Sequence, residues 1–270
     1  MAPKNYKTFF IPGLHGQYKL WRGEILKNCN QVDKIIQMGN VIGCNEIAQD
    51  GPKYGANETL LKFMYLYRST YDNWHQLVGP NEIAALNAPE EWTNAHSRQF
   101  LRNAWFAPDP MMTVATVDKQ RLVTHGGLTY GEWLDIGSPK TAEEAADALN
   151  RRYARTLYQG PAFRLGDGPQ YAANPIWADP LMELYPSWIT APVSAPFDQV
   201  HTSGTLNSPE GREMANTITS PLHYVSQVNF RSYGSIATIK DARFLSIHLE
   251  LPGKMISTVP RPQALYIEKS

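Results

Sequence analysis

The first third of the chain alternates short apolar runs with helical patterns, and this alternation limits the fold more than any other feature. The apolar runs are YKTFFIPG, VDKIIQMG and WHQLVG, and the helical stretches between them are QYKLWRGEILKN and NETLLKFMYLYRST. This order of strands and helices is typical of βαβ units around a largely parallel sheet. In such sheets, polar side chains that do chemistry collect in the loops after the carboxyl ends of the strands. Those loops contain GLHGQ, GNVIGCN and GPNE.

The middle and the end of the chain predict a second set of strands. MMTVATVD and QRLVTHGG are joined by a short polar turn at residues 118–120, which is a hairpin signal. The stretch HYVSQVNFRSYGSIATIKDARFLSIHLELPG is rich in β-branched and aromatic residues and alternates in RFLSIHLEL. We therefore expect it to close a second sheet.

Residues 139–158 are the clearest predicted helix. Thr141 is placed to cap its first turn, and Glu144 completes a capping box. One apolar face is kept by Ala145, Leu149, Tyr153 and Leu157. The basic cluster RRYAR on this helix is predicted to be a solvated face, because its charges suit the helix dipole.

The segment 160–196 is dense in Pro, Gly and aromatic residues. This composition disfavours regular elements and predicts an ordered loop lying over the sheet. Such a loop serves either as a lid or as an interaction surface.

Composition narrows the class of protein. Lys plus Arg equals Asp plus Glu, so the net charge of zero argues against a general affinity for nucleic acid or for an anionic membrane. Neither a signal-peptide core nor a run of about 18 apolar residues is present. Cys29 and Cys44 lack a CxxC spacing and indicate reduced thiols. We expect a single domain over residues 1–270 that is cytoplasmic, or virion-associated if the chain is viral, and not secreted by a signal peptide.

Three histidines follow apolar runs and precede small residues, namely His15, His125 and His201. A histidine at a strand end is a candidate metal ligand or proton carrier, although each alone also fits an ordinary hydrogen-bonded loop. The other histidines lie in strand or helix patterns and are expected to be structural: His75, His96, His223 and His248.

The segments HGQY, THGGL, IWADP and FDQVHT, in this order, resemble the calcineurin-like metallophosphoesterase superfamily. The similarity is greatest to its phosphoprotein phosphatase branch of bacterial and phage type, and it covers roughly residues 5–205. The resemblance implies an α/β fold (an α+β sandwich) of two facing mixed β-sheets flanked by helices, and a binuclear metal centre that hydrolyses phosphoric esters.

The metal-binding motifs of the family are degenerate in this chain. The first motif, D-x-H-G, falls on residues 13–16, with Gly13 at the place of the aspartate and His15 retained. The second, G-D-x-x-D-R-G, falls on residues 39–45. There, the metal-bridging aspartate, the supporting aspartate and the phosphate-gripping arginine are replaced by Asn40, Gly43 and Cys44.

The third motif, G-N-H-E, falls on residues 79–82. Pro80 replaces the ligand asparagine, and Asn81 replaces the general-acid histidine. His125 and His201 match the two late histidine ligands of the family. The resemblance thus leaves four remnant metal positions: His15, Asn40, His125 and His201.

These replacements matter because of charge. Two divalent ions about 3.5–4 Å apart repel by roughly 18 kcal/mol at an effective dielectric constant of 20, so carboxylates must neutralise them. The acidic ligands are absent, and Asn81 cannot donate a proton to a leaving alkoxide at neutral pH. Cys44 has no positive neighbour that would lower its pKa, which favours a structural thiol over a nucleophile or metal ligand.

Two main functions and a third alternative remain open. The first is a pseudophosphatase that acts as a binding or structural module, without a cofactor. Its protein partner contacts surface loops such as the aromatic-rich segment 163–188, from Phe163 to Trp188. The second is a divergent active phosphoesterase with one Zn or Mn ion on His15, His125 and His201, since three histidines plus water is a known catalytic arrangement. The third is a chance resemblance in an unrelated α/β protein. The oligomeric state is left open.

Overall fold

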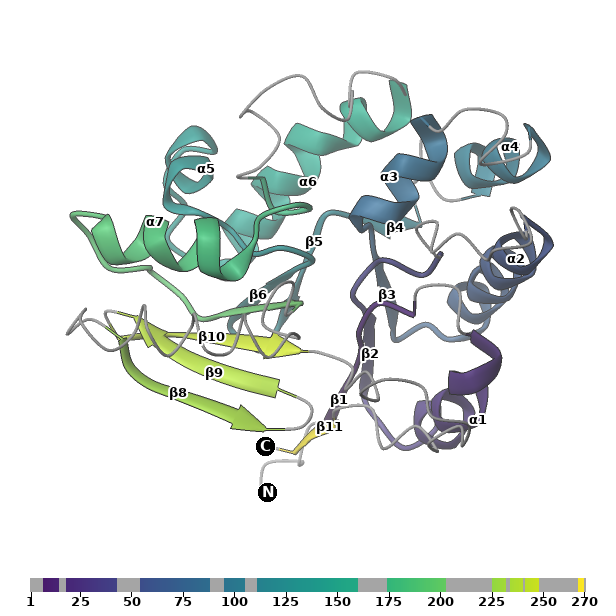
Figure 1. Ribbon diagram of the computed structural model, residues 1–270, viewed down its shortest axis with the longest axis horizontal. Helices are drawn as coiled ribbons and strands as arrows, with labels where there is room; N and C mark the ends of the chain where they lie inside the picture. The colour runs from purple at the N-terminus through teal and green to yellow at the C-terminus, as the bar shows by residue number, and fades with distance from the viewer. Residues whose placement is uncertain are drawn as a thin grey trace.

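The computed structural model describes residues 7–14, 18–42, 54–87, 95–104, 111–159, 174–202, 225–231, 234–239, 241–247 and 267–269. Within them the protein is an α/β fold of two mixed sheets with flanking helices, as the sequence predicts (Figure 1). None of the helices in the described part of the chain is long and apolar enough to cross a membrane.

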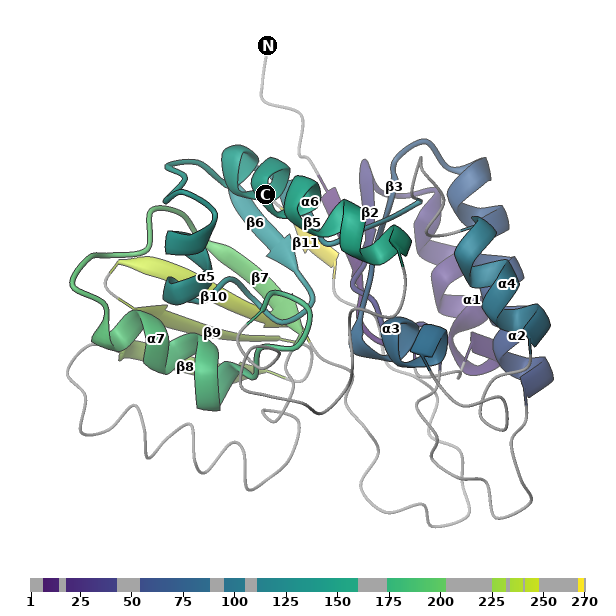
Figure 2. The same cartoon turned by 90° about the horizontal axis from the view of Figure 1, so that it is seen from above.

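The first sheet contains the strands predicted in the first third of the chain. Its order is β11-β1-β2-β3-β4, with β1 to β4 parallel and β11 antiparallel to β1. The strands are β1 (Lys7–Ile11), β2 (Lys34–Gln37), β3 (Trp74–Leu77), β4 (Met112–Thr113) and β11 (Ile267–Lys269). The accompanying helices are α1 (Tyr18–Cys29), α2 (Tyr54–Thr70), α3 (Pro80–Asn87) and α4 (Ala95–Ala104). Helices α1, α2 and α4 lie on the outer side of this sheet (Figures 1 and 2).

The second sheet has the order β5-β6-β7-β10-β9-β8. Strands β6, β7 and β10 are parallel, whereas β5, β9 and β8 run antiparallel to their neighbours. The strands are β5 (Ala115–Asp118), β6 (Arg121–Thr124), β7 (Gln199–Thr202), β8 (Val225–Arg231), β9 (Gly234–Ile239) and β10 (Ala242–Ile247). Helices α5 (Tyr130–Asp135), α6 (Ala142–Gln159) and α7 (Tyr185–Thr190) cover one of its faces (Figure 2).

The two sheets pack against each other through a small apolar cluster. It is formed by Phe10, Ile36, Met38, Leu77, Val123, Val200, Leu245 and Ile247. A second and larger apolar cluster lies between the sheets and their helices and includes Phe9, Ile35, Leu122 and Phe244. Because side chains alternate along a strand, strands β1, β2, β3, β6 and β10 supply residues to both clusters.

The segment 111–118, predicted as one strand of a hairpin, is divided between the two sheets. Residues 112–113 pair with β3 in the first sheet, whereas 115–118 pair with β6 in the second. Asn150 of α6 stabilises the crossing, because its Oδ1 accepts hydrogen bonds from the N–H groups of Val114 and Ala115, both at 3.0 Å. The prediction of a single strand is therefore wrong, and the predicted hairpin exists only between β5 and β6, across a turn in which Lys119 has φ 59°.

The predicted capping box of α6 is confirmed. Thr141 Oγ1 accepts a hydrogen bond from the N–H of Glu144 at 3.2 Å, and the Glu144 carboxylate accepts one from the N–H of Thr141 at 3.3 Å. Of the predicted apolar face, Ala145, Leu149 and Tyr153 are buried. The side chain of Leu157 lies outside the described residues.

The segment 160–196, predicted to be an irregular loop, contains helical structure over residues 180–190, whereas its other described residues, 174–179 and 191–196, are turns, bends and irregular backbone. A π-helical turn, η1 (Pro180–Leu184), leads directly into α7. Asp179 caps η1, since its Oδ1 accepts hydrogen bonds from the N–H groups of Leu181 and Met182 at 2.9 and 3.0 Å. Pro180 and Pro186 occupy first-turn positions, where a missing N–H costs nothing. Residues 160–173 of this segment lie outside the described part.

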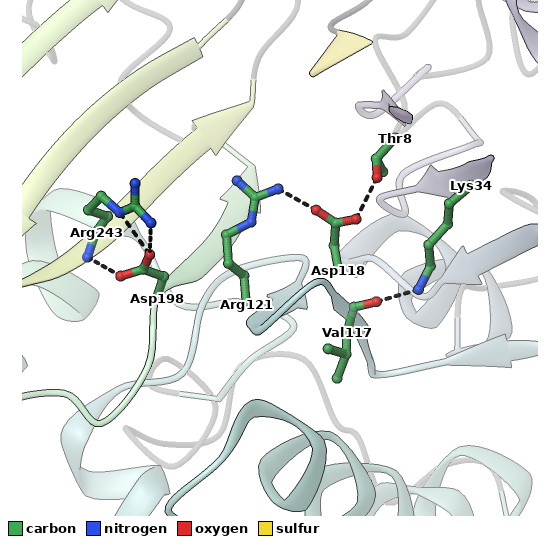
Figure 3. A network of polar contacts seen from close by, with 7 residues as sticks. All are labelled: Thr8, Lys34, Val117, Asp118, Arg121, Asp198 and Arg243. Carbon is green, nitrogen blue, oxygen red and sulfur yellow. Dashed lines mark hydrogen bonds and ion pairs between the residues drawn. The ribbon is translucent and has the colours of Figure 1, made fainter. Parts of the chain in front are cut away.

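A polar network joins the two sheets near the start of β1 and β2 (Figure 3). Asp118 is fully buried and accepts hydrogen bonds from Thr8 and from Arg121, while Lys34 donates to the carbonyl of Val117. Nearby, Asp198 pairs with Arg243, whose side chain is 68% exposed. Asp118 thus connects the first sheet to the β5–β6 hairpin at one end of their interface.

Candidate functional site

The loops after β2 and β3 meet backbone to backbone, as expected for neighbouring parallel strands. Gly39 has φ 84°, and a Cβ there would lie 2.6 Å from the backbone nitrogen of Gly79. Only glycine allows this approach at a left-handed position. Asn40 follows with φ 51°, a conformation that asparagine tolerates better than most residues.

Asn40 is the centre of this site. Its side-chain Oδ1 accepts a hydrogen bond from the N–H of Asn81 at 2.9 Å. Its Nδ2 lies 3.2 Å from Nε2 of His125. Because a backbone N–H can only donate, the carbonyl end of the amide must face Asn81 and the NH₂ end must face His125.

His125 is held in a defined tautomer by this arrangement. Its Nδ1 donates to the carbonyl oxygen of Met38, so Nε2 is the nitrogen that accepts from Asn40. Its own carbonyl accepts from the N–H and the hydroxyl of Thr202 at 2.8 and 2.9 Å. His125 therefore connects β7 of the second sheet to the loop after β2 in the first.

The buried carboxylate of Glu82 holds the loops after β2 and β3 together. One carboxylate oxygen accepts from the N–H groups of Asn40 and Gly79, both at 2.8 Å. The other accepts from Val41 at 2.8 Å and Ile42 at 3.2 Å. Burial raises the pKa of this carboxyl to about 7, and the four N–H groups oppose that rise. Glu82 is the last residue of the segment 79–82, and the sequence alone gives it no role.

His201 lies on the other face of the second sheet. It is fully buried, its Nδ1 donates to the carbonyl of Thr202 at 2.6 Å, and its Nε2 accepts from the hydroxyl of Tyr185 at 3.2 Å. Burial lowers the pKa of His201 to about 4. Its strand neighbour Val200 faces the first sheet, so His201 points toward α7. The structure therefore does not bring His125 and His201 together.

Several of the other predicted site residues have no described geometry. His15, Gly43 and Cys44 lie outside the described residues, as do His223 and His248. Gly13 lies in the buried segment after β1, and Pro80 begins α3. Asn81 is largely buried and donates from Nδ2 to the carbonyl of Ile42 at 2.8 Å.

Two further residues match their expected structural roles. Burial raises the pKa of the Cys29 thiol to about 12, which leaves it unreactive. His75 faces Thr116 at 3.4 Å, and burial lowers its pKa to about 4.

The described residues do not fit the binuclear metal centre that the resemblance implies. Oδ1 of Asn40 and both oxygens of Glu82 accept hydrogen bonds from backbone N–H groups, and Nε2 of His125 accepts one from the Asn40 amide. Both ring nitrogens of His201 have partners as well. In this part of the chain, moreover, no three His, Cys, Asp or Glu side chains are grouped so that they could hold a metal ion.

Comparison with known proteins leaves the family open. No protein-family model matches the chain, and no curated protein is a significant match. Among solved structures, the chain is similar to a cold-active protein tyrosine phosphatase, with 15% identity, a TM-score of 0.46 and coverage of 90% of this chain and 79% of that one. The cold-active protein tyrosine phosphatase of a psychrophilic Shewanella species has 17% identity, a TM-score of 0.42, and coverage of 64% and 57%.

A metallophosphoesterase from Sphaerobacter thermophilus has 16% identity, a TM-score of 0.30, and coverage of 46% of this chain and 48% of that one. The chain thus spans about half the length of this protein. Similarities this weak do not establish an activity for the chain.

Proposed function

We propose that the protein is a catalytically inactive metallophosphatase-like protein, a pseudophosphatase, whose scaffold serves as a binding or structural module. The observation that carries the proposal is the hydrogen bond from Asn40 to His125. This hydrogen bond occupies the lone pair of His125 Nε2 that a metal ion would need. The Asn40 amide that donates the hydrogen bond is held in place by the N–H of Asn81.

The chemistry of the neighbouring positions supports the same proposal. A binuclear centre requires carboxylates to offset the repulsion of its ions, and the matching positions hold Gly13, Asn40 and Gly43. The one buried carboxylate of the described site, Glu82, is engaged by four backbone N–H groups. The Asn81 amide is no proton donor at neutral pH, so a general acid is also lacking at that position.

Metal content and phosphoester hydrolysis, measured on the same preparation, test the proposal. The purified full chain is analysed for bound metal and assayed with p-nitrophenyl phosphate and added Mn²⁺ or Zn²⁺. We expect no stoichiometric metal and no turnover above the buffer rate. Turnover and bound metal that are both lost in the His125→Ala variant would instead support the single-metal phosphoesterase and overturn the proposal.

The binding role that we propose is contact with a protein partner through surface loops. In the described part of the segment 163–188, Tyr185 and Trp188 are buried, so their rings belong to the core and offer no contact area. Met182 of η1 is 64% exposed, which makes it the apolar side chain available for contact. A photoreactive residue at position 182 should therefore form a saturable adduct with one protein, and the same residue at the exposed Glu143 should not.

A further inference from the structure

We infer that the side-chain amide of Asn40 takes the place of a cation, closing the interface between the two sheets while denying His125 to metal ions. This inference rests on the proposed function and deepens it. It assigns Asn40 as a positioning residue, and it predicts that one change of functional group converts the contact into a site for a divalent cation such as Zn²⁺.

The oxygen and the nitrogen of the Asn40 amide have different partners, and the two atoms cannot change places. Reversing the amide would place its NH₂ group against the N–H of Asn81 and its oxygen against the lone pair of His125 Nε2. Both contacts would then be repulsive. The NH₂ group therefore faces His125, where a cation would otherwise bind.

The loop that carries Asn40 is rigidly held by contacts that involve no metal. Glu82 accepts the N–H groups of Asn40, Val41 and Ile42, and Gly39 packs on the backbone of Gly79. His125 is fixed on its other side by the carbonyl of Met38. Amide and imidazole thus meet as two preorganised groups.

Replacing the Asn40 amide by a carboxylate puts an acceptor, instead of a donor, beside His125 Nε2. In an Asn40→Asp variant, one carboxylate oxygen still accepts a hydrogen bond from the N–H of Asn81. The other oxygen takes the place of the NH₂ group and faces the lone pair of His125 Nε2. Two acceptors then oppose each other until Nε2 takes up a proton or binds a cation. A carboxylate oxygen and an imidazole nitrogen are both common zinc ligands, so a Zn²⁺ ion relieves the repulsion.

Three forms of the full chain test the inference: wild type, Asn40→Asp and Asn40→Gly. The glycine variant keeps the left-handed backbone and removes the side chain, so it is the matched control. Melting temperature and Zn²⁺ affinity, by calorimetry, are measured with added ZnCl₂ or EDTA. We expect both variants to melt about 4–8 °C below wild type, as the loss of a partly buried polar contact implies.

Only the aspartate variant should respond to the ion. We expect its Zn²⁺ affinity to exceed that of wild type by at least about tenfold, with a matching rise in melting temperature. Wild type and Asn40→Gly should respond to neither ZnCl₂ nor EDTA. An equal response of all three forms, or none from the aspartate variant, would overturn the inference and leave the proposed function standing. Tight Zn²⁺ binding with phosphoester turnover by wild type would overturn the proposed function instead.

A measurement on the wild-type protein keeps the inference testable if a variant does not fold. The ¹⁵N spectrum of the histidine rings should show His125 with a proton on Nδ1 and an unprotonated Nε2 that accepts a hydrogen bond from the Asn40 side chain. A proton on Nε2 of His125 would contradict the assignment directly.

Discussion

The amide nitrogen of Asn40 lies 3.2 Å from Nε2 of His125, and this contact joins the loop after β2 in one sheet to the end of β6 in the other. The same interface is held elsewhere by Asp118, which accepts hydrogen bonds from Thr8 and Arg121. Among the described residues, these polar contacts and that of His75 with Thr116 connect the two sheets, with the apolar cluster of Phe10 and its neighbours as the interface core.

The Glu82→Gln substitution should strongly destabilise the fold. One carboxylate oxygen would become an NH₂ group that faces backbone N–H donors, leaving two of them without an acceptor. At about 1–3 kcal/mol for each unsatisfied buried group, we expect a loss of about 3 kcal/mol in the free energy of unfolding, measured in urea. The exposed Glu143→Gln is the control, and a loss no larger than that of this control would contradict the role of Glu82.

Stability should fall in mild acid because of His201. Its pKa is lowered from 6.5 to about 4 in the folded protein, so between these values the unfolded chain binds a proton that the folded one does not. The free energy of unfolding should therefore decrease by about 3 kcal/mol as the pH falls from 6.5 to 4.

The variant His201→Gln isolates this effect from that of other groups. Glu82 acts in the opposite sense, because a raised pKa makes its contribution decrease as the pH rises from 4.5 to about 7. The comparison is therefore the difference in unfolding free energy between wild type and variant at each pH. A difference that does not change between pH 7 and pH 4.5 would contradict the burial of an uncharged His201.

Two aspartates near the sheet interface should differ sharply in their contributions. Asp118→Ala removes a fully buried carboxylate and leaves Arg121, which is only 12% exposed, without this partner, so we expect a loss of about 3 kcal/mol. Asp198→Ala removes a pair with the exposed Arg243 and should cost less than about 1 kcal/mol. The two variants are compared in thermal or urea unfolding. Equal losses of stability would contradict the conclusion that the Asp118 pair is buried and the Asp198 pair is exposed.

The contact between the loops after β2 and β3 should tolerate no side chain at Gly39. Gly39→Ala combines a left-handed backbone with a Cβ only 2.6 Å from the next loop, and we expect a loss of at least about 3 kcal/mol in stability. The matched control is Gly131→Ala in α5, where nothing lies within 4 Å, and a gain of about 0.5–1 kcal/mol is expected there. A neutral Gly39→Ala variant in calorimetry would contradict the close approach of the two loops.

Part of the candidate site could be found from the sequence because its signals are local. The glycines and polar residues after the strands indicated which loops meet, and Asn40, Asn81 and His125 do meet. The role of Glu82 could not be read from nearby residues, since three of its four partners are backbone N–H groups of a loop about 40 residues away. Nor does strand periodicity reveal that a strand ends at Thr113 and a new one begins at Ala115 in another sheet.

The sequence by itself determined the order β1-α1-β2-α2-β3 in the first third of the chain, the β5–β6 hairpin and the capping of α6, because these depend on residues within a few positions of one another. The tertiary structure alone decided which way the polar side chains point. His125 and His201 both end apolar runs, yet one faces the first sheet and the other faces Tyr185 of α7. Tyr185 and Trp188, aromatic residues in a Pro-rich segment, became core because that segment folded onto the second sheet. Side-chain direction depends on which surface packs against which, and that relationship arises only once distant segments meet.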